Sequence, residues 1–441
     1  MTANAVRGRR KIDMVALPLV LLVLALVLGV PIAVALAGAG MFGIYVVTGD
    51  FSKVMGIISL APFSTVADYA LTTIPMFILM AFFSASSGLA RDLYTAASNW
   101  CSHIKGGLAI ATVFACGIFG AMSGASTAAA SVMSKIAMPE MRRHGYSDEL
   151  AAGAIGIGAT LDILIPPSIA MVIYGVATQT SIGKLLIAGV VPGLIAGVLL
   201  AAMIYLWVVV SPKHAPSTFR VSREERWASL VRIWPSLLLI FLVLVLLYTG
   251  IATPTEVGAL GALLAGIIGA VFGRLTLADA LDAVKSTIRT SAMIFLILIG
   301  ATIFGYYMAL SRIPQDMVSA VTAMDLNRWV VIIGIVVAYF IISMFMDEIP
   351  LLLLTLQLTF PLITSLGFDP IWFGVMSMMM VAMGLVFPPV GLIAFIVSAT
   401  AGVDLMKVYK GTSILMISMV ITTVLLMIFP QIALWLPATM R

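Results

Sequence analysis

Long apolar segments separated by short polar turns constrain this chain more than any other sequence feature. They follow one another along nearly all of its 441 residues. A transmembrane helix needs about 20 apolar residues, so the chain has room for roughly a dozen spans. The composition agrees, because 62% of the residues are hydrophobic and 10% are charged, whereas soluble domains contain about 25% charged residues. We therefore predict an all-α, polytopic membrane protein and exclude a soluble enzyme.

The lengths of the apolar segments predict where membrane helices are interrupted. The first segment, Val15 to Val47, predicts one helix bent at Gly29–Pro31. Further segments predict helices over residues 72–89, 107–122, 185–210, 234–247, 256–272, 291–310, 329–346, 371–387 and 413–436. Others are too short to span a bilayer alone, namely 151–165, 168–178, 351–363 and 390–399. Short or Pro-interrupted segments at corresponding places in two halves indicate a transporter binding site.

Landmarks in the first half of the chain recur in the second half at one constant spacing. The pairs are Pro139 and Pro361, Gly145 and Gly367, Pro166–Pro167 and Pro388–Pro389, and Ala177–Thr178 and Ala399–Thr400, each 222 residues apart. Chance similarity between apolar segments is the alternative, but the only two Pro-Pro pairs in the sequence are among these landmarks. Each repeat is predicted to contain a short re-entrant hairpin, a turn with glycine, and a helix broken at the Pro-Pro pair.

The distribution of basic residues predicts that the two repeats are inverted. The first turn, Arg142–Gly145, is basic, whereas the corresponding second turn, Thr364–Asp369, contains no base. Because Lys and Arg favour cytoplasmic loops, the two turns are expected on opposite sides of the membrane. The polar segment Ser211–Arg232 is predicted to be a cytoplasmic linker between the halves, with a regulatory or partner site as the alternative. Residues 276–290 are amphipathic and are expected at the membrane interface.

The sequence also excludes several kinds of chemistry. Its three histidines, His103, His144 and His214, lie at segment edges or in loops. Because it contains no HExxH, GxSxG or P-loop motif, the chain is predicted not to be an enzyme or an ATPase. Its net charge of +5 is too small and too scattered to indicate nucleic-acid binding. Active transport by such a chain would draw on an ion gradient or on another subunit.

The first repeat combines a hydroxyl-rich hairpin tip with a Pro-Pro break. The tip is Ser123–Thr127, and the break, Pro166–Ser168, follows a glycine-rich helix that ends near Asp162. Proline cannot donate a backbone hydrogen bond, so the break frees carbonyl oxygens at membrane depth. Such carbonyls, with hydroxyl groups, are hard oxygen ligands suited to Na⁺, and the N–H groups of the helix that follows suit an anion. Close helix packing by small residues is the alternative.

The second repeat is less polar than the first. At the same spacing Ser126 corresponds to Glu348, and the second break lies within Gly384–Pro389. Ionisable groups at membrane depth indicate function, so Asp162 and Glu348 are the acidic residues that we single out. The Thr253–Glu256 segment has two equally supported interpretations, a helix cap and a role in transport.

Two overlapping sets of site residues follow from these half-sites. The predicted solute-binding residues are Ser123, Gly124, Ser126, Thr127, Asp162, Pro167, Ser168, Glu348 and Pro389. The predicted Na⁺ ligands are Ser126, Thr127, Gly156, Gly158, Thr160, Pro166, Glu348, Gly384 and Phe387. Na⁺ is the only cofactor that we expect.

Several motifs of this chain resemble the large, DctM-type membrane subunit of tripartite ATP-independent periplasmic (TRAP) transporters. They are SGASTAAA at 123–130, IPPSIAMVIYG at 165–175, TGIATPTEVGAL at 249–260, FPLITSLGFDPIWFGV at 360–375 and FPPVGLIAF at 387–395. The resemblance implies a multi-pass, Na⁺-coupled, elevator-type transporter in the lipid bilayer of a bacterial inner membrane. It also implies two partners, a small four-helix membrane subunit and a periplasmic substrate-binding protein, and a carboxylate or zwitterionic small-molecule solute.

The expected division of the chain follows the repeats. It comprises scaffold helices at 1–105, a first transport repeat at 106–184, scaffold helices with the linker at 185–327, a second transport repeat at 328–406 and a C-terminal helix at 407–441. Because the first apolar segment already begins at Val15, the small subunit is expected to be a separate chain. The family commonly has glycine where this chain has Asp162, which puts a simple dicarboxylate solute in doubt unless Asp162 faces the scaffold. A binding-protein-independent, Na⁺-coupled anion transporter of the same superfamily is the alternative function.

Overall fold

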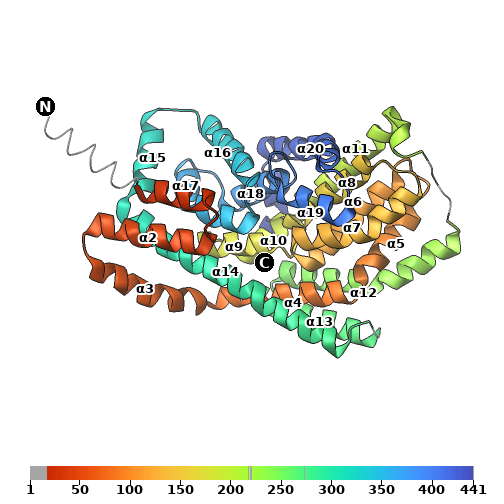
Figure 1. Cartoon of the computed structure of the whole chain (residues 1–441), viewed down its shortest axis with the longest axis horizontal. Helices are drawn as coiled ribbons and strands as arrows, with labels where there is room; N and C mark the ends of the chain where they lie inside the picture. The colour runs from red at the N-terminus through yellow and green to blue at the C-terminus, as the bar shows by residue number, and fades with distance from the viewer. Residues whose placement is uncertain (1–16, 217, 219–220, 273, 441) are drawn as a thin grey trace. The chain divides into compact units, whose positions relative to one another are not determined.

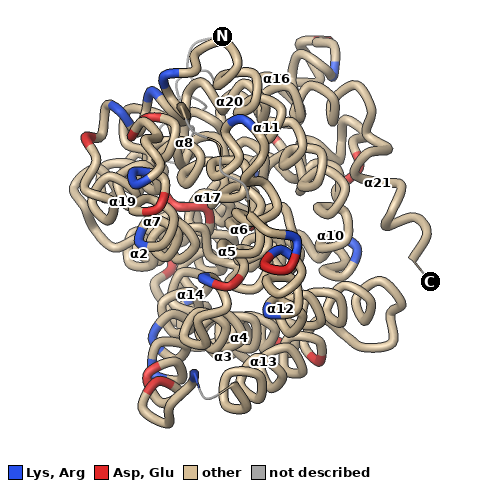
Figure 2. The backbone as a smooth tube through the Cα atoms, turned by 90° about the vertical axis from the view of Figure 1, so that its right-hand side faces the viewer, with Lys and Arg blue, Asp and Glu red and all other residues tan. Residues whose placement is uncertain are grey.

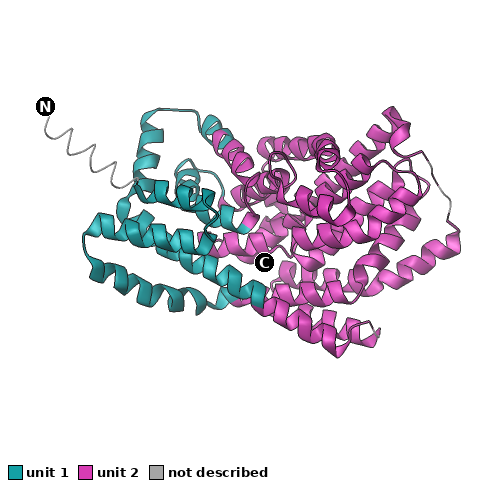
Figure 3. Ribbon diagram, viewed as in Figure 1, with its two compact units in different colours: residues 1–71, 289–333, 349–369 teal, residues 72–288, 334–348, 370–441 magenta. Residues whose placement is uncertain are grey.

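The computed structural model describes residues 17–216, 218, 221–272 and 274–440, and every regular element in these ranges is a helix (Figure 1). The all-α prediction is therefore confirmed for the described residues. Contacts between helices divide the chain into two compact units, each assembled from three stretches of sequence (Figure 3). Unit 1 contains residues 1–71, 289–333 and 349–369, and unit 2 contains residues 72–288, 334–348 and 370–441.

Seven helices of the described part are long and apolar enough to cross a membrane, judged from length and composition. They are Tyr69–Ser86, Ile182–Val210, Arg223–Thr249, Pro254–Val271, Leu277–Ser311, Glu348–Ser365 and Leu405–Ile428. The helix over Glu348–Ser365 includes residues 351–363, which the sequence predicted to be too short to span; that prediction is wrong because the helix extends beyond the apolar segment at both ends. Shorter apolar helices of 10–17 residues accompany these seven.

Unit 1 is built around the close approach of helix α2 (Ile32–Thr48) to helix α14 (Leu277–Ser311). A Cβ atom on Gly40 would lie only 2.8 Å from the backbone nitrogen of Phe304. Glycine at this position therefore lets the two backbones touch, as is typical of membrane helix pairs. The other helices of unit 1 are Leu17–Val27, α3 (Phe51–Val66), α15 (Ile313–Ala323), the start of α16 (Arg328–Ser343), and α17 (Glu348–Ser365) after its first residue.

The first apolar segment forms two helices, not the single bent helix that the sequence predicted. The chain is helical over Leu17–Val27 and again from Ile32. Gly29 adopts a left-handed φ of 77°, and Pro31 at the N-cap of α2 has no N–H to continue a helix. The helix α3 that follows was not predicted. It begins where the Asp50 side chain accepts a hydrogen bond from the Ser52 N–H at 2.9 Å.

Unit 2 contains both Pro-Pro pairs and most of the helices. Before the first pair lie α4 (Thr73–Ser86), α5 (Leu89–Cys101), α6 (Gly107–Ser123), α7 (Ser126–Arg143), α8 (Asp148–Ala159) and the 3₁₀ turn η2 (Thr160–Ile163). After it lie α9 (Ile169–Thr178), α10 (Ile182–Ala188), α11 (Val190–Val210), α12 (Arg223–Thr249), α13 (Pro254–Val271), α18 (Pro370–Gly384), α19 (Leu392–Ala401), α20 (Leu405–Ile428) and α21 (Gln431–Ala438). The backbones of α8 and α20 touch, since a Cβ on Gly153 would lie 2.6 Å from the carbonyl carbon of Gly411.

Some helix boundaries differ from the sequence expectation. Part of the predicted 211–232 linker is helical, because Ser222 and Glu225 form a capping box that starts α12. Residues 276–290 are not a separate segment, because all but the first belong to the 35-residue helix α14. The segment predicted over 413–436 is divided before Pro430 into α20 and α21. The Thr253–Glu256 motif forms a second capping box, so its interpretation as a helix cap is confirmed.

The landmarks found in the sequence coincide with structural boundaries. Helices α7 and α17 begin at residues 126 and 348 and end at residues 143 and 365, so both boundaries keep the spacing of 222 residues. Gly145 and Gly367, which follow these helices, have φ of 77° and 76°. The bonds within both Pro-Pro pairs are cis. The two repeats therefore share their turn and break positions as well as their sequence landmarks.

Charged residues are sparse along the chain (Figure 2), and several of them gather where α7 turns into α8. Arg142 Nε donates to Asp148 at 2.8 Å, and Lys407 Nζ lies 3.5 Å from the same carboxylate. Lys410 pairs with Glu149 at 3.4 Å. The hydrogen bond from Arg142 lowers the pKa of Asp148 below its usual range, since it favours the ionised carboxylate. Ion pairs thus connect this turn to the start of α20.

Candidate functional site

The tip of the first hairpin rests directly on the first Pro-Pro break. Helix α6 ends at Ser123 and α7 begins at Ser126, because Gly124 between them takes a left-handed φ of 56°. A Cβ atom on Gly124 would lie 3.2 Å from the carbonyl oxygen of Pro167. A side chain at position 124 would therefore push the tip away from the break.

The first break is a stretch without regular helix between η2 and α9. Pro166 and Pro167 occupy it, and neither can donate a backbone hydrogen bond. Ser168 caps α9 because its hydroxyl oxygen accepts from the Met171 N–H at 3.4 Å. The break thus presents backbone oxygens on one side and the N-terminus of a ten-residue helix on the other.

A short hydrogen bond joins the hairpin tip to the residue before the break. The Ser126 hydroxyl donates to Asp162 Oδ1 at 2.5 Å, and the two side chains are only 3% and 1% exposed. Gly120 of α6 makes room for this carboxylate, because a Cβ there would overlap the Asp162 side chain and lie 3.1 Å from its Cα. A serine that donates its proton keeps its oxygen lone pairs free. Those lone pairs are available to a cation.

Glu348, the first residue of α17, brings a second buried carboxylate to this place. Its side chain interacts electrostatically with Asp162, with Asp347 and with the Ser126 hydroxyl. Its Oε2 atom is buried and has no hydrogen-bond partner within the described residues. In that part of the chain no basic side chain forms an ion pair with Asp162 or Glu348. Buried carboxylates without counter-charges attract a cation, since an uncompensated buried charge is costly.

Other predicted residues of the first repeat lie at helix contacts nearby. Thr127 follows Ser126 and is half-buried, and the Ser123 hydroxyl donates to the Gly120 carbonyl at 3.4 Å. A Cβ on Gly156 would contact Thr412 of α20 at 3.0 Å, and one on Gly158 would contact the Cys116 Cβ of α6 at 3.2 Å. The Thr160 hydroxyl donates to the Ile157 carbonyl at 2.9 Å. The side of each residue that the structure describes is therefore engaged in packing or in local hydrogen bonds.

The second break is closed by hydroxyl groups of α20, which the sequence analysis did not single out. The Tyr409 hydroxyl lies 3.1 Å from the Pro389 carbonyl oxygen and 2.7 Å from that of Val390. The Thr412 hydroxyl donates to the Val386 carbonyl oxygen at 2.9 Å. Tyr409 and Thr412 are three residues apart and so share one face of their helix, which is the only signal that pointed to them.

The remaining residues of the second half-site pack on α16. A Cβ on Gly384 would lie 2.7 Å from the Ser343 Cβ, and the ring centroid of Phe387 lies 5.4 Å from that of Phe340. At the spacing of 222 residues Gly384 corresponds to Asp162. The two breaks therefore differ chemically, because one carries a carboxylate where the other carries no side chain.

Comparison with known proteins gives the chain relatives along almost its whole length. A family model described as "Tripartite ATP-independent periplasmic transporter, DctM component" matches residues 19–432. The C4-dicarboxylate TRAP transporter large permease protein DctM of Pseudomonas aeruginosa is 35% identical over 376 residues, which are 85% of this chain and 88% of the relative. The ectoine TRAP transporter large permease protein TeaC of Halomonas elongata is 33% identical over 404 residues, 91% of this chain and 93% of the relative.

A sialic acid relative and a solved structure extend this picture. The sialic acid TRAP transporter large permease protein SiaM of Vibrio cholerae is 30% identical over 372 residues, 84% of this chain and 86% of the relative. The crystal structure of the Alcanivorax borkumensis YdaH transporter, at 14% identity, matches with a TM-score of 0.64 and covers 86% of this chain and 89% of that one. This second likeness concerns the fold alone. By the family model and these relatives, the chain belongs to the DctM family of TRAP transporter large permease proteins, which are inner-membrane transport subunits and not enzymes.

Proposed function

We propose that this chain carries a small organic acid, either a carboxylate or a zwitterion, into the cell together with Na⁺. The observation that carries this proposal is the buried Ser126–Asp162 hydrogen bond beside the unpartnered Glu348 carboxylate. This group of oxygens lies where the hairpin tip meets the first break. Unwound backbone at membrane depth is tolerated only where it lines a cavity or is buried in protein, and transporters use it for ion and substrate sites.

The oxygens at the tip suit Na⁺ as the coupling ion. Ser126 would supply a hydroxyl oxygen, and Asp162 and Glu348 would supply carboxylate oxygens. These are hard ligands, and the carboxylates lack counter-charges within the described residues. Asp162 would also hold the Ser126 hydroxyl in an orientation that turns its lone pairs toward the ion. Thr127 and the backbone oxygens of the break would complete the coordination.

The solute would bind next to the ion, at the N-terminus of α9. The N–H groups of the first turn and the helix dipole favour a carboxylate at this point, and Ser168 sets where the helix begins. The names of the relatives include C4-dicarboxylates, sialic acid and ectoine. The additional negative charge of Asp162 favours a solute that also carries positive charge over one with two carboxylates.

Contacts between the two repeats support an inverted arrangement and hence an elevator mechanism. The turn after α7 meets the end of α19, because Arg142 donates to the carbonyl oxygens of Ala401 and Gly402 at 3.2 and 3.3 Å. Conversely, Tyr174 near the end of α9 donates to the carbonyl oxygen of Pro370 at 2.7 Å, in the turn of the second repeat. Each turn thus lies beside the far end of the other repeat, as inverted copies require.

The transport cycle that we propose needs two partners, a small membrane subunit and a periplasmic binding protein that delivers the solute. Uptake of a radiolabelled solute into proteoliposomes containing both membrane subunits tests this. We expect uptake only with an inward Na⁺ gradient and with the binding protein outside. Full uptake with K⁺ alone would refute Na⁺ coupling. Na⁺-dependent uptake without the binding protein would instead establish the alternative, an independent Na⁺-coupled anion transporter.

A further inference from the structure

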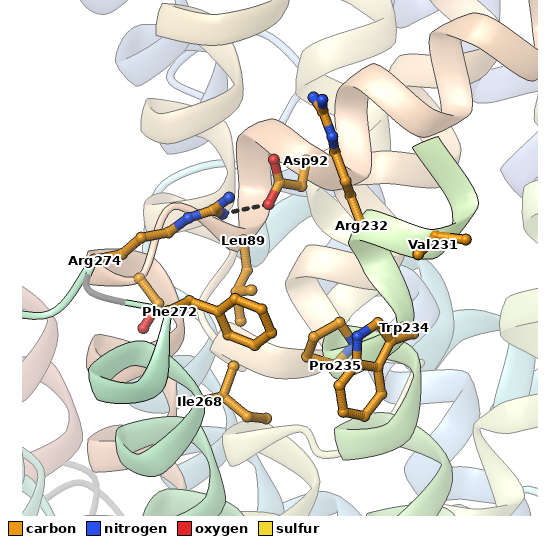
Figure 4. Close-up of a pocket in the computed structure, with 10 residues that line it drawn as sticks. Leu89, Asp92, Val231, Arg232, Trp234, Pro235, Ile268, Phe272 and Arg274 are labelled. Carbon is orange, nitrogen blue, oxygen red and sulfur yellow. Dashed lines mark hydrogen bonds and ion pairs between the residues drawn. The ribbon is translucent and has the colours of Figure 1, made fainter. Parts of the chain in front are cut away.

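A cavity away from both breaks lies in unit 2 between α5, α12 and the end of α13. Its volume is about 340 Å³, within the size range of small-ligand sites. Its lining residues are Ser87, Leu89, Asp92, Val231, Arg232, Trp234, Pro235, Ile268, Phe272 and Arg274 (Figure 4). None of them belongs to the transport half-sites.

Charged and apolar side chains separate to opposite ends of this cavity (Figure 4). Asp92, Arg232 and Arg274 gather at one end, and Ile268, Phe272 and Trp234 line the other. Arg274 forms an ion pair with Asp92. That pair leaves the Arg232 guanidinium as an excess positive charge at the polar end. A bound molecule should therefore combine an anionic group with an apolar body.

The position of the cavity along its helices indicates the boundary of the bilayer. Arg232 directly precedes the apolar part of α12, and Arg274 directly follows α13. Both helices are long and apolar enough to cross a membrane. Trp234 and Phe272 are about half exposed, at 51% and 48%. Tryptophan at this level and arginine beyond it are typical of the membrane–water interface.

We propose that this cavity binds the phosphate of an anionic phospholipid of the surrounding bilayer. Arg232 would bind the phosphate oxygens, and Arg274, held by Asp92, would provide a second donor. The acyl chains would follow the apolar end past Phe272 and Trp234. Basic pockets between membrane helices on the cytoplasmic side bind anionic head groups in this way. The volume accommodates the head group and glycerol, while the chains extend into the bilayer.

Native mass spectrometry of the purified chain, titrated in detergent with phosphatidylglycerol or phosphatidylcholine, tests this proposal. We expect saturable binding of phosphatidylglycerol and about tenfold weaker binding in Arg232→Gln, the change associated with losing one strong charged contact. Arg232→Lys should recover part of it. Arg223→Gln is the matched control, because Arg223 lies on the same helix, is exposed and does not line the cavity.

Additional arms separate the lipid from other occupants. Inorganic phosphate, added at increasing concentration, should not displace the phosphatidylglycerol, because it has no apolar part. The titration is repeated on the chain co-purified with its small membrane subunit, where we expect unchanged binding. The proposal is overturned if Arg232→Gln binds phosphatidylglycerol like the original chain, if phosphate alone competes fully, or if the small subunit abolishes the binding and so occupies the cavity itself.

Discussion

Removing the Ser126 hydroxyl is the most direct test of the candidate Na⁺ site. The change Ser126→Ala deletes one cation ligand and the hydrogen bond to Asp162, but changes little volume. Both side chains are almost fully buried, so water cannot replace the lost bond. A hydrogen bond to a charged group is worth about 1.5–3 kcal/mol, which corresponds to about 10- to 100-fold in an equilibrium constant. We expect the apparent Na⁺ affinity of uptake to fall by about that factor.

The structure provides a matched control on the same helix. Ser134 of α7 is also buried, and its hydroxyl has no hydrogen-bond partner among the described residues. Ser134→Ala should therefore leave the Na⁺ dependence of uptake unchanged. Both variants should reach the membrane in equal amounts, which a blot of membrane fractions checks. Equal Na⁺ dependence of the two variants would mean that Ser126 only packs the tip.

A double-mutant cycle with Asp162→Asn isolates the interaction itself. If Ser126 acts by orienting its oxygen against the Asp162 carboxylate, the two effects overlap. The double variant should then be scarcely weaker in Na⁺ affinity than Asp162→Asn alone, and the coupling should reach about 1 kcal/mol or more, within the range for residues in contact. Fold-losses that simply multiply would refute the reasoning, because independent ligands give additive free energies.

Further predictions concern packing, the second break and acid stability. Gly120→Ala should lower the melting temperature through overpacking of about 1–3 kcal/mol, and adding Asp162→Gly should restore it because the overlapping side chain is gone; a single variant that melts normally would contradict this. Tyr409→Phe leaves two carbonyl oxygens of the second break without their donor and should also lower the melting temperature, whereas unchanged melting would argue that these carbonyls are satisfied otherwise. The folded-state pKa of Asp148 is lowered by Arg142, so its stabilising contribution is present at neutral pH and is lost as the pH falls through that lowered value, below about 4. Arg142→Gln should reduce this acid loss in melting curves between about pH 3 and 7, and an unchanged acid limb would refute it.

Backbone punctuation explains which parts of the fold the sequence predicted well. Gly145, Gly367 and the two Pro-Pro pairs act through the backbone itself, so their positions translate directly into turns and breaks. Helix α5 was missed because it is amphipathic and carries Arg91 and Asp92, unlike the uniformly apolar segments that the search favoured. The start of α12 was missed because the capping box at Ser222 lies inside a charged stretch that resembles a solvated linker.

The candidate site shows a different limit of sequence reasoning. Ser126 and Asp162 were assigned to one site because a hairpin tip and a break within one repeat are expected to meet. The contribution of Gly120 was not predicted, although it lies within the same motif. Its value depends on which face of α6 turns toward η2, and a helix that is apolar on all sides has no periodicity to reveal that face. The same reason hid Tyr409.

The backbone contact between Gly153 and Gly411 has a mechanical consequence. With no side chain between them, α8 and α20 cannot slide past each other without the carbonyl groups of one helix colliding with the other. Tyr409 and Thr412 add ties from α20 to the second break. In an elevator movement, α20 would therefore travel with both breaks as part of one rigid body. The mobile part of the carrier would then extend beyond the two repeats, to a helix that the repeat pattern leaves out.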